Sequence, residues 1–216
     1  MPDISQFALF LAAAIVLAVT PGPGIFYVAA RTLAGGRMEG VTSSLGTGVG
    51  GLVHVIAGSL GVSAVILASA ELFTVLKLVG AAYLVWLGYR TFRAAGRDSL
   101  PALSDPVDAP SVGSRRAFSE GVLVEALNPK TAAFFLAFIP QFIDPGMGHV
   151  VLQYVWLGGI SVAFNTVADV VVAYVASGVR QGAAARPGLI RRLRQGSGAA
   201  MAAMGVGLAL ARRPAA

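Results

Sequence analysis

The hydrophobic positions of this chain gather in long runs that are separated by short polar segments. Apolar runs cover residues 4–30, 41–68, 72–92, 117–139 and 149–178, followed by a shorter run at 196–211. About 20 mainly apolar residues in a helix span the hydrocarbon core of a bilayer. The pattern therefore predicts an all-α polytopic membrane protein, with six transmembrane helices if the short last run also crosses.

Composition agrees with this pattern. The chain has 216 residues, of which 56% are hydrophobic and 12% charged, whereas soluble domains carry about 25% charged residues. The net charge of +6 does not indicate nucleic-acid binding, because the basic residues lie in short loops beside apolar helices, where they set orientation. There is no cysteine, which excludes disulfides and thiolate metal sites.

The distribution of arginines predicts the orientation in the membrane. Arginines cluster in alternate loops, and basic loops stay on the cytoplasmic side. We therefore expect the N-terminus outside and these residues in the cytoplasm: Arg31, Arg37, Arg90, Arg93, Arg97, Arg115, Arg116, Arg180, Arg186, Arg191, Arg192 and Arg194. Six spans would place Arg212 and Arg213 outside, against the same rule, whereas five spans would keep them inside.

The first apolar run is interrupted by Thr20, Pro21, Gly22, Pro23 and Gly24. Prolines and glycines break a helix, and in hydrocarbon such a break persists only where protein or a cavity surrounds it. Thr20 before Pro21 predicts an N-cap with proline at the first helical position. The new helix start would offer free N–H groups to an anion, such as a substrate carboxylate. The alternative is a proline kink with only a packing role.

A second break, Asn128-Pro129-Lys130, interrupts the run at 117–139 in the same way. Asparagine is a strong N-cap, and proline suits the next position. Lys130 could bind a carboxylate, pair with an acid, or do both. Glu125, one turn before the break, is a weaker candidate for the same role.

The two breaks divide the chain into similar halves. We predict a first three-helix repeat at 1–93, a polar cytoplasmic linker at 94–116 and a second three-helix repeat at 117–216. Three helices is an odd number, so the second repeat would insert upside down. Broken helices at matching positions of inverted repeats indicate the binding site of a transporter.

Polar residues within the apolar runs are candidates for function, because they are costly inside a membrane. His54 could carry a proton, or it could be a neutral histidine bonded to a backbone carbonyl. Asn165 and Asp169 are four residues apart and share one helix face. Asp169 could bind a substrate ammonium or carry a proton, or it could form a structural ion pair with Lys130.

The run at 41–68 is rich in glycine. Gly46 and Gly50 form a small-xxx-small pair that allows close helix approach. This pair could serve packing within the chain or the contact of a homodimer.

Three segments resemble the lysine-exporter (LysE/RhtB) family of amino-acid exporters, namely TPGPGIFYVAARTLAGGRMEG, GAAYLVWLGYRTFR and LNPKTAAFFLAFIPQF. The resemblance implies six helices, a bacterial inner membrane, and amino-acid export driven by the proton gradient. It implies that the motif positions are Pro21, Gly22, Pro23, Asn128, Pro129 and Lys130. Relatives commonly have asparagine where this chain has Gly24, so substrate choice does not carry over.

Together with these residues, the resemblance implies an exporter of small neutral amino acids, such as homoserine, threonine or leucine, by proton antiport. The two helix starts and Lys130 would hold the carboxylate, Asp169 and Asn165 the ammonium, and His54 or Asp169 the proton. No phosphate-binding motif, metal-ligand spacing or nucleophile–base pair occurs, so we expect neither a cofactor nor enzyme activity. The alternatives are a non-transporting structural or assembly protein and an exporter of another solute.

Overall fold

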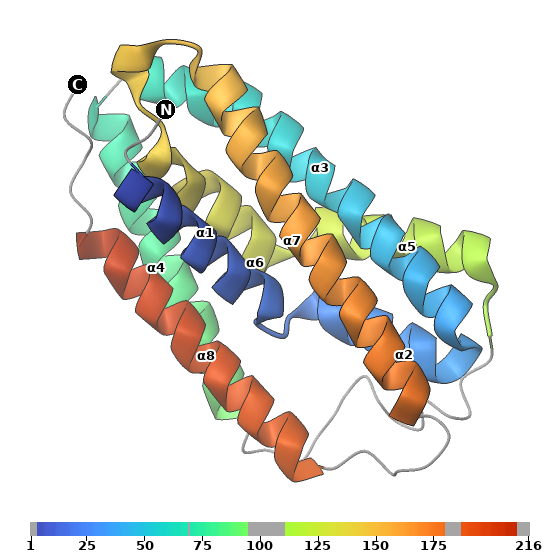
Figure 1. Cartoon of the computed structure of the whole chain (residues 1–216). Helices are drawn as coiled ribbons and strands as arrows, with labels where there is room; N and C mark the ends of the chain where they lie inside the picture. The colour runs from blue at the N-terminus through green and yellow to red at the C-terminus, as the bar shows by residue number, and fades with distance from the viewer. Residues whose placement is uncertain (1–3, 69, 95–110, 180–186, 211–216) are drawn as a thin grey trace.

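The computed structural model describes residues 4–68, 70–94, 111–179 and 187–210, and every regular element in these ranges is helical (Figure 1). The predicted all-α class is therefore confirmed. In chain order the elements are α1 (Ile4–Val19), α2 (Pro23–Gly35), α3 (Arg37–Ala68), α4 (Ala70–Ala94), α5 (Ser114–Ala126), α6 (Pro129–Ala133), the π-helical turn η1 (Phe134–Phe138), the 3₁₀ turns η2 (Ile139–Phe142) and η3 (Pro145–Met147), α7 (Val150–Val179) and α8 (Pro187–Leu210).

Several of these helices can cross a membrane. In the described ranges, two single helices are long and apolar enough, over Arg37–Gly61 and Val150–Gly178. Two helix pairs, α1 with α2 and α5 with the helix that follows it, qualify together and bend by 43° and 42°. This gives up to four candidate spans, and α4 and α8 are not among them. The structure thus has several candidate spans, and the arrangement as six inverted helices stays a prediction.

The first helix is broken where the sequence predicts, but its second half begins later than expected. Gly22, not Thr20, is the N-cap, with φ −141° and ψ −171° and no side-chain bond, and Pro23 opens α2. A residue before proline favours this extended conformation, so the second proline determines the start. The Thr20 N–H donates to the Val16 carbonyl over 3.1 Å, so Thr20 closes α1 instead of capping α2.

The second break has the predicted capping. Asn128 is the N-cap, Pro129 is the first residue of α6, and the Asn128 Oδ1 accepts from the Lys130 N–H at 3.0 Å. The helix boundaries differ from expectation. α5 begins at Ser114, so Arg115 and Arg116 belong to a helix and not to the linker, and the turn η2 contains Pro140.

Glycines of α3 bring it against α5. An added Cβ at Gly46 would overlap the Phe118 carbonyl oxygen, and one at Gly50 would overlap the Val122 carbonyl oxygen. On the other helix, a Cβ at Gly121 would lie 2.7 Å from the Ser43 carbonyl oxygen. Close backbone approach is what small-residue pairs provide between membrane helices. Of the two readings of Gly46 and Gly50, the structure shows packing within the chain.

The remaining helices complete two flanks. α3 also packs against α7, while α8 lies along α4 on the other side of the molecule (Figure 1). Between the flanks, α1 and the η turns pack into an aromatic core that includes Phe10, Phe134, Phe142 and Tyr154. α8 begins at Pro187, so Arg191, Arg192 and Arg194 lie in a helix and not in a loop. The predicted loop arginines Arg180 and Arg186 lie outside the described residues.

Candidate functional site

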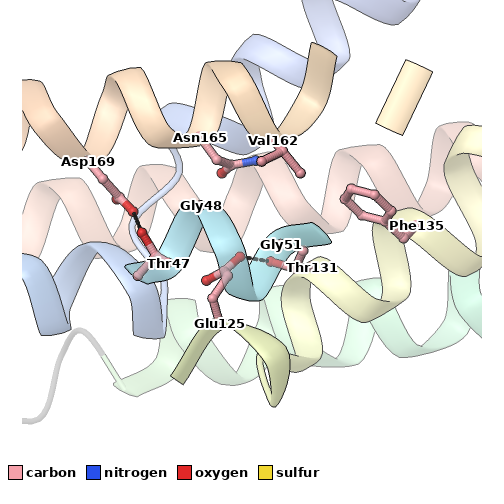
Figure 2. Close-up of a pocket in the computed structure, with 9 residues that line it drawn as sticks. All are labelled: Thr47, Gly48, Gly51, Glu125, Thr131, Phe135, Val162, Asn165 and Asp169. Atoms are coloured by element: carbon pink, nitrogen blue, oxygen red, sulfur yellow. Dashed lines mark hydrogen bonds between the residues drawn. The ribbon is translucent and has the colours of Figure 1, made fainter. Parts of the chain in front are cut away.

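A small polar cavity lies where α3, α5, α6 and α7 meet. It has space for about one water molecule. Three polar groups and two carboxylates face it among apolar and glycine neighbours (Figure 2). Its lining residues are Thr47, Gly48, Gly51, Glu125, Thr131, Phe135, Val162, Asn165 and Asp169.

Asp169 and Asn165 form one wall of the cavity. Their four-residue spacing on α7 puts both on one helix face, as the sequence predicts. Asp169 is buried, and its Oδ2 accepts a 2.6 Å hydrogen bond from the Thr47 hydroxyl on α3 (Figure 2). The Asn165 amide donates to the Ser161 carbonyl over 3.0 Å. This wall can present a carboxylate and an amide to a small cation.

Glu125, in the last turn of α5, forms the opposite wall. Its Oε1 accepts from the Thr131 hydroxyl at 2.6 Å, and its Oε2 accepts from the Asn128 side-chain amide at 2.9 Å. Each oxygen of this buried carboxyl group therefore accepts a hydrogen bond from one neighbouring side chain. The start of α2 also reaches this group, since a Cβ on Gly24 would lie 2.6 Å from Oε2.

Sequence reasoning ranked Glu125 low and missed Thr47 and Thr131. Glu125 is an acid well inside an apolar run, which is a sequence signal for function. The contact of Thr47 with Asp169 joins residues 122 apart, and spacing within one helix gives no signal for such a contact.

Lys130 points away from the cavity, toward the first break. Its Nζ donates to the carbonyl oxygens of Leu17 at 3.0 Å and Thr20 at 2.9 Å, at the C-terminal end of α1. The negative end of a helix dipole favours a cation there. The ion pairs that the structure shows near this region join Glu120 to Arg31 and Arg116, and none joins Lys130 to Asp169 within 4.0 Å. The expected Lys130–Asp169 ion pair is therefore not formed.

His54 contacts two residues that line the cavity, Glu125 and Phe135. Its Nε2 lies 2.9 Å from the Glu125 carbonyl oxygen, and its ring packs 5.7 Å from that of Phe135. A carbonyl only accepts hydrogen bonds, so Nε2 carries the hydrogen in this arrangement. This contact is the one that the structural alternative for His54 requires. It leaves the proton-carrying role as a prediction.

The residues of the first break lie next to residues of the cavity but do not line it. Thr20, Pro21, Gly22, Pro23 and Gly24 are not among its lining residues. Gly22 packs against Lys130, since an added Cβ would lie 3.2 Å from the lysine side chain. Of the second break, Asn128 reaches Glu125, while Pro129 is exposed. The two breaks thus meet through Lys130, and the cavity borders the second.

A polar cluster joins the two halves at the arginine-rich end. Arg31 on α2 lies 3.4 Å from Glu120 on α5, and Arg116 donates to the same carboxylate at 2.7 Å. The Tyr27 hydroxyl donates to the Ala117 carbonyl over 2.9 Å. These contacts hold α2 against α5 beyond the cavity.

Broken helices that meet beside a buried polar cavity are the arrangement found at the binding sites of membrane transporters. The model of the family described as LysE type translocator matches residues 15–212. The chain belongs to this family of membrane translocators.

Curated relatives cover most of the chain. An uncharacterized membrane protein of Vibrio cholerae is 30% identical over 97% of this chain and 98% of its own length. The homoserine/homoserine lactone efflux protein of Salmonella typhimurium is 31% identical over 73% of this chain and 74% of its own. The leucine efflux protein of Klebsiella pneumoniae is 27% identical over 69% of this chain and 71% of its own length. No solved structure matches the chain.

Proposed function

We propose that this protein exports small neutral amino acids across the bacterial inner membrane in exchange for protons. The family and the efflux relatives support amino-acid export. The observation that carries the proposal is the buried Asp169 carboxylate, which lines a cavity together with Asn165 on the same helix face, beside a helix break. A buried carboxylate with an amide neighbour suits a substrate ammonium, and a carboxylate can also carry a proton.

The proposal includes the inverted-repeat architecture with six spans and an outside N-terminus. The bent pairs α1/α2 and α5/α6 support it, because they occupy matching positions in the two halves. The glycine contacts between α3 and α5 give an interface across which one half can move against the other.

The carboxylate role expected of Lys130 and the two helix starts requires a rearrangement. In the described conformation the Lys130 ammonium is bound by two carbonyls, and the start of α2 lies against Glu125. Lys130 could meet a substrate carboxylate only after leaving Leu17 and Thr20.

The test is transport by purified protein in proteoliposomes with an imposed pH gradient and a panel of labelled amino acids. We expect gradient-dependent accumulation of a neutral amino acid, and its loss in Asp169→Asn. Asp144→Asn is the matched control, because Asp144 caps a surface turn and asparagine caps equally well. A folded wild-type protein that accumulates no amino acid would overturn the proposal and would favour another solute or a structural role.

A further inference from the structure

The charged groups around the cavity identify which end of a substrate it recognises. Two carboxylates, Glu125 and Asp169, line opposite walls, and no cation is among the lining residues. Lys130 interacts electrostatically with both acids, but its ammonium group donates its hydrogen bonds to carbonyls of α1. The cavity therefore offers acceptors for an ammonium group and no cationic partner for a carboxylate.

The position that an anion would take is occupied by the protein itself. A helix start attracts anions, but the start of α2 at Gly24 lies against the Glu125 carboxylate. Glu125 is fixed by Thr131 and Asn128. Asp169 accepts a hydrogen bond from one side chain, Thr47. Of the two acids, Asp169 is therefore the one that can accept further hydrogen bonds from a substrate.

Charge balance gives the same result. The buried charged side chains around the cavity are Glu125, Asp169 and Lys130, which are 6%, 5% and 4% exposed. With all three ionised, one negative charge has no counterpart, and an uncompensated charge inside a membrane protein is costly. A proton on Asp169 removes that charge, and so does one substrate ammonium. The available space, about that of one water molecule, also fits one ammonium.

We propose, on the basis of the proposed function, that the cavity exchanges one proton for the ammonium group of its substrate and does not recognise the substrate carboxylate. The substrate carboxyl group then lies outside this ammonium site, so an amino acid with a masked carboxyl group should be exchanged much as the free amino acid is. The substrate class is then small α-amino compounds with a free ammonium, including amides of the transported amino acids. Acylation of the amine would abolish transport.

The test is counterflow in proteoliposomes at equal pH on both sides. Labelled leucine or homoserine, whichever the panel identifies, is taken up into vesicles preloaded with the unlabelled amino acid, its amide or its N-acetyl derivative. We expect the amide to drive uptake within about threefold of the parent, a difference of about 0.6 kcal/mol. The N-acetyl derivative should drive no more uptake than protein-free liposomes, which also measure leak of the amide.

Variants connect this selectivity to Asp169. Asp169→Asn should lose exchange of both the amino acid and its amide, while Asp144→Asn keeps both, with size exclusion and circular dichroism showing that each variant is folded. Exchange of the amino acid without exchange of its amide would overturn this inference and leave the proposed function standing. Exchange of the N-acetyl derivative would also overturn it. A folded wild type that exchanges no amino acid would overturn the proposed function itself.

Discussion

The Lys130 Nζ donates a 2.9 Å hydrogen bond to the backbone carbonyl of Thr20, which lies 110 residues earlier in the chain. The bond ties the second helix break to the end of α1. A helix that ends inside a membrane leaves carbonyl groups without partners, and this lysine supplies one. The carbonyl end of the first broken helix therefore depends on a side chain of the second.

We expect Lys130→Met to destabilise the protein strongly. Methionine has a similar volume but cannot donate, so the carbonyls of Leu17 and Thr20 lose a partner and the buried acids lose their counter-charge. Removing one side of a buried charged interaction costs about 3–5 kcal/mol. The measurement is the midpoint of thermal unfolding in detergent.

The control for this variant is Arg116→Met, which removes an exposed cation from an ion pair four residues apart on α5. Exposed pairs contribute about 0–1 kcal/mol. If both substitutions lower the midpoint equally, Lys130 has no special role in holding the breaks together.

Local patterns were sufficient to predict the breaks and the paired residues on α7. Proline, glycine and asparagine act on their own backbone, so Asn128 and the interruption near Pro23 follow from sequence. The helix start at Pro23, in place of Pro21, depends on the extended conformation of Gly22. Both prolines offer a possible start in the sequence, and at the observed one Gly22 and Gly24 lie against Lys130 and Glu125.

The cavity could be predicted only in part. Asp169 and Asn165 were expected because their spacing places them together on one helix. Thr47 and Glu125 join the site only when α3, α5 and α7 pack, and the direction of Lys130 depends on where α1 ends. Side-chain partners between distant helices leave no periodic signal in a single sequence.

Gly50 provides a test of the close contact between α3 and α5. We expect Gly50→Ala to destabilise the protein, because the new methyl group would overlap the Val122 carbonyl and reach the Glu125 side chain. Overpacking of this kind costs about 1–3 kcal/mol, and it should also reduce transport by displacing Glu125. Thermal unfolding and counterflow measure the two effects.

Gly61→Ala is the matched control in the same helix, since no atom lies within 4 Å of the added Cβ. Alanine favours a helix over glycine by up to about 1 kcal/mol, so this variant should be neutral or more stable. A Gly50→Ala protein as stable as Gly61→Ala would show that the helices are not in the described contact.

Thr47 tests the orientation of Asp169. Thr47→Val keeps the shape of the side chain and removes the donor to the Asp169 carboxylate. Loss of a buried hydrogen bond to a charged group costs on the order of 1–3 kcal/mol, and we expect a raised KM for the exported amino acid. Thr42→Val is the control, because the Thr42 hydroxyl bonds only carbonyls of its own helix. An equal KM in the two variants would show that Thr47 does not contribute to substrate binding.

His54 can be assigned by comparing two substitutions. Its Nε2 donates to the Glu125 carbonyl at 2.9 Å, and this contact fixes the last turn of α5 beside the cavity. His54→Gln retains an N–H donor but has no group that titrates near neutral pH, whereas His54→Leu loses both properties. If the contact is structural, His54→Gln should keep gradient-driven accumulation within about threefold of wild type, and His54→Leu should lose stability and transport together.

The His54 variants could also show the opposite result, a proton-carrying role for this residue. A His54→Gln protein that keeps counterflow at equal pH, but no longer accumulates substrate against a gradient, would show that His54 carries the proton. In that case Asp169 would bind only the substrate ammonium, and the exchange of proton for ammonium would require two residues. Counterflow and accumulation must therefore be measured on the same preparation, because only their ratio separates a lost proton carrier from a weakened site.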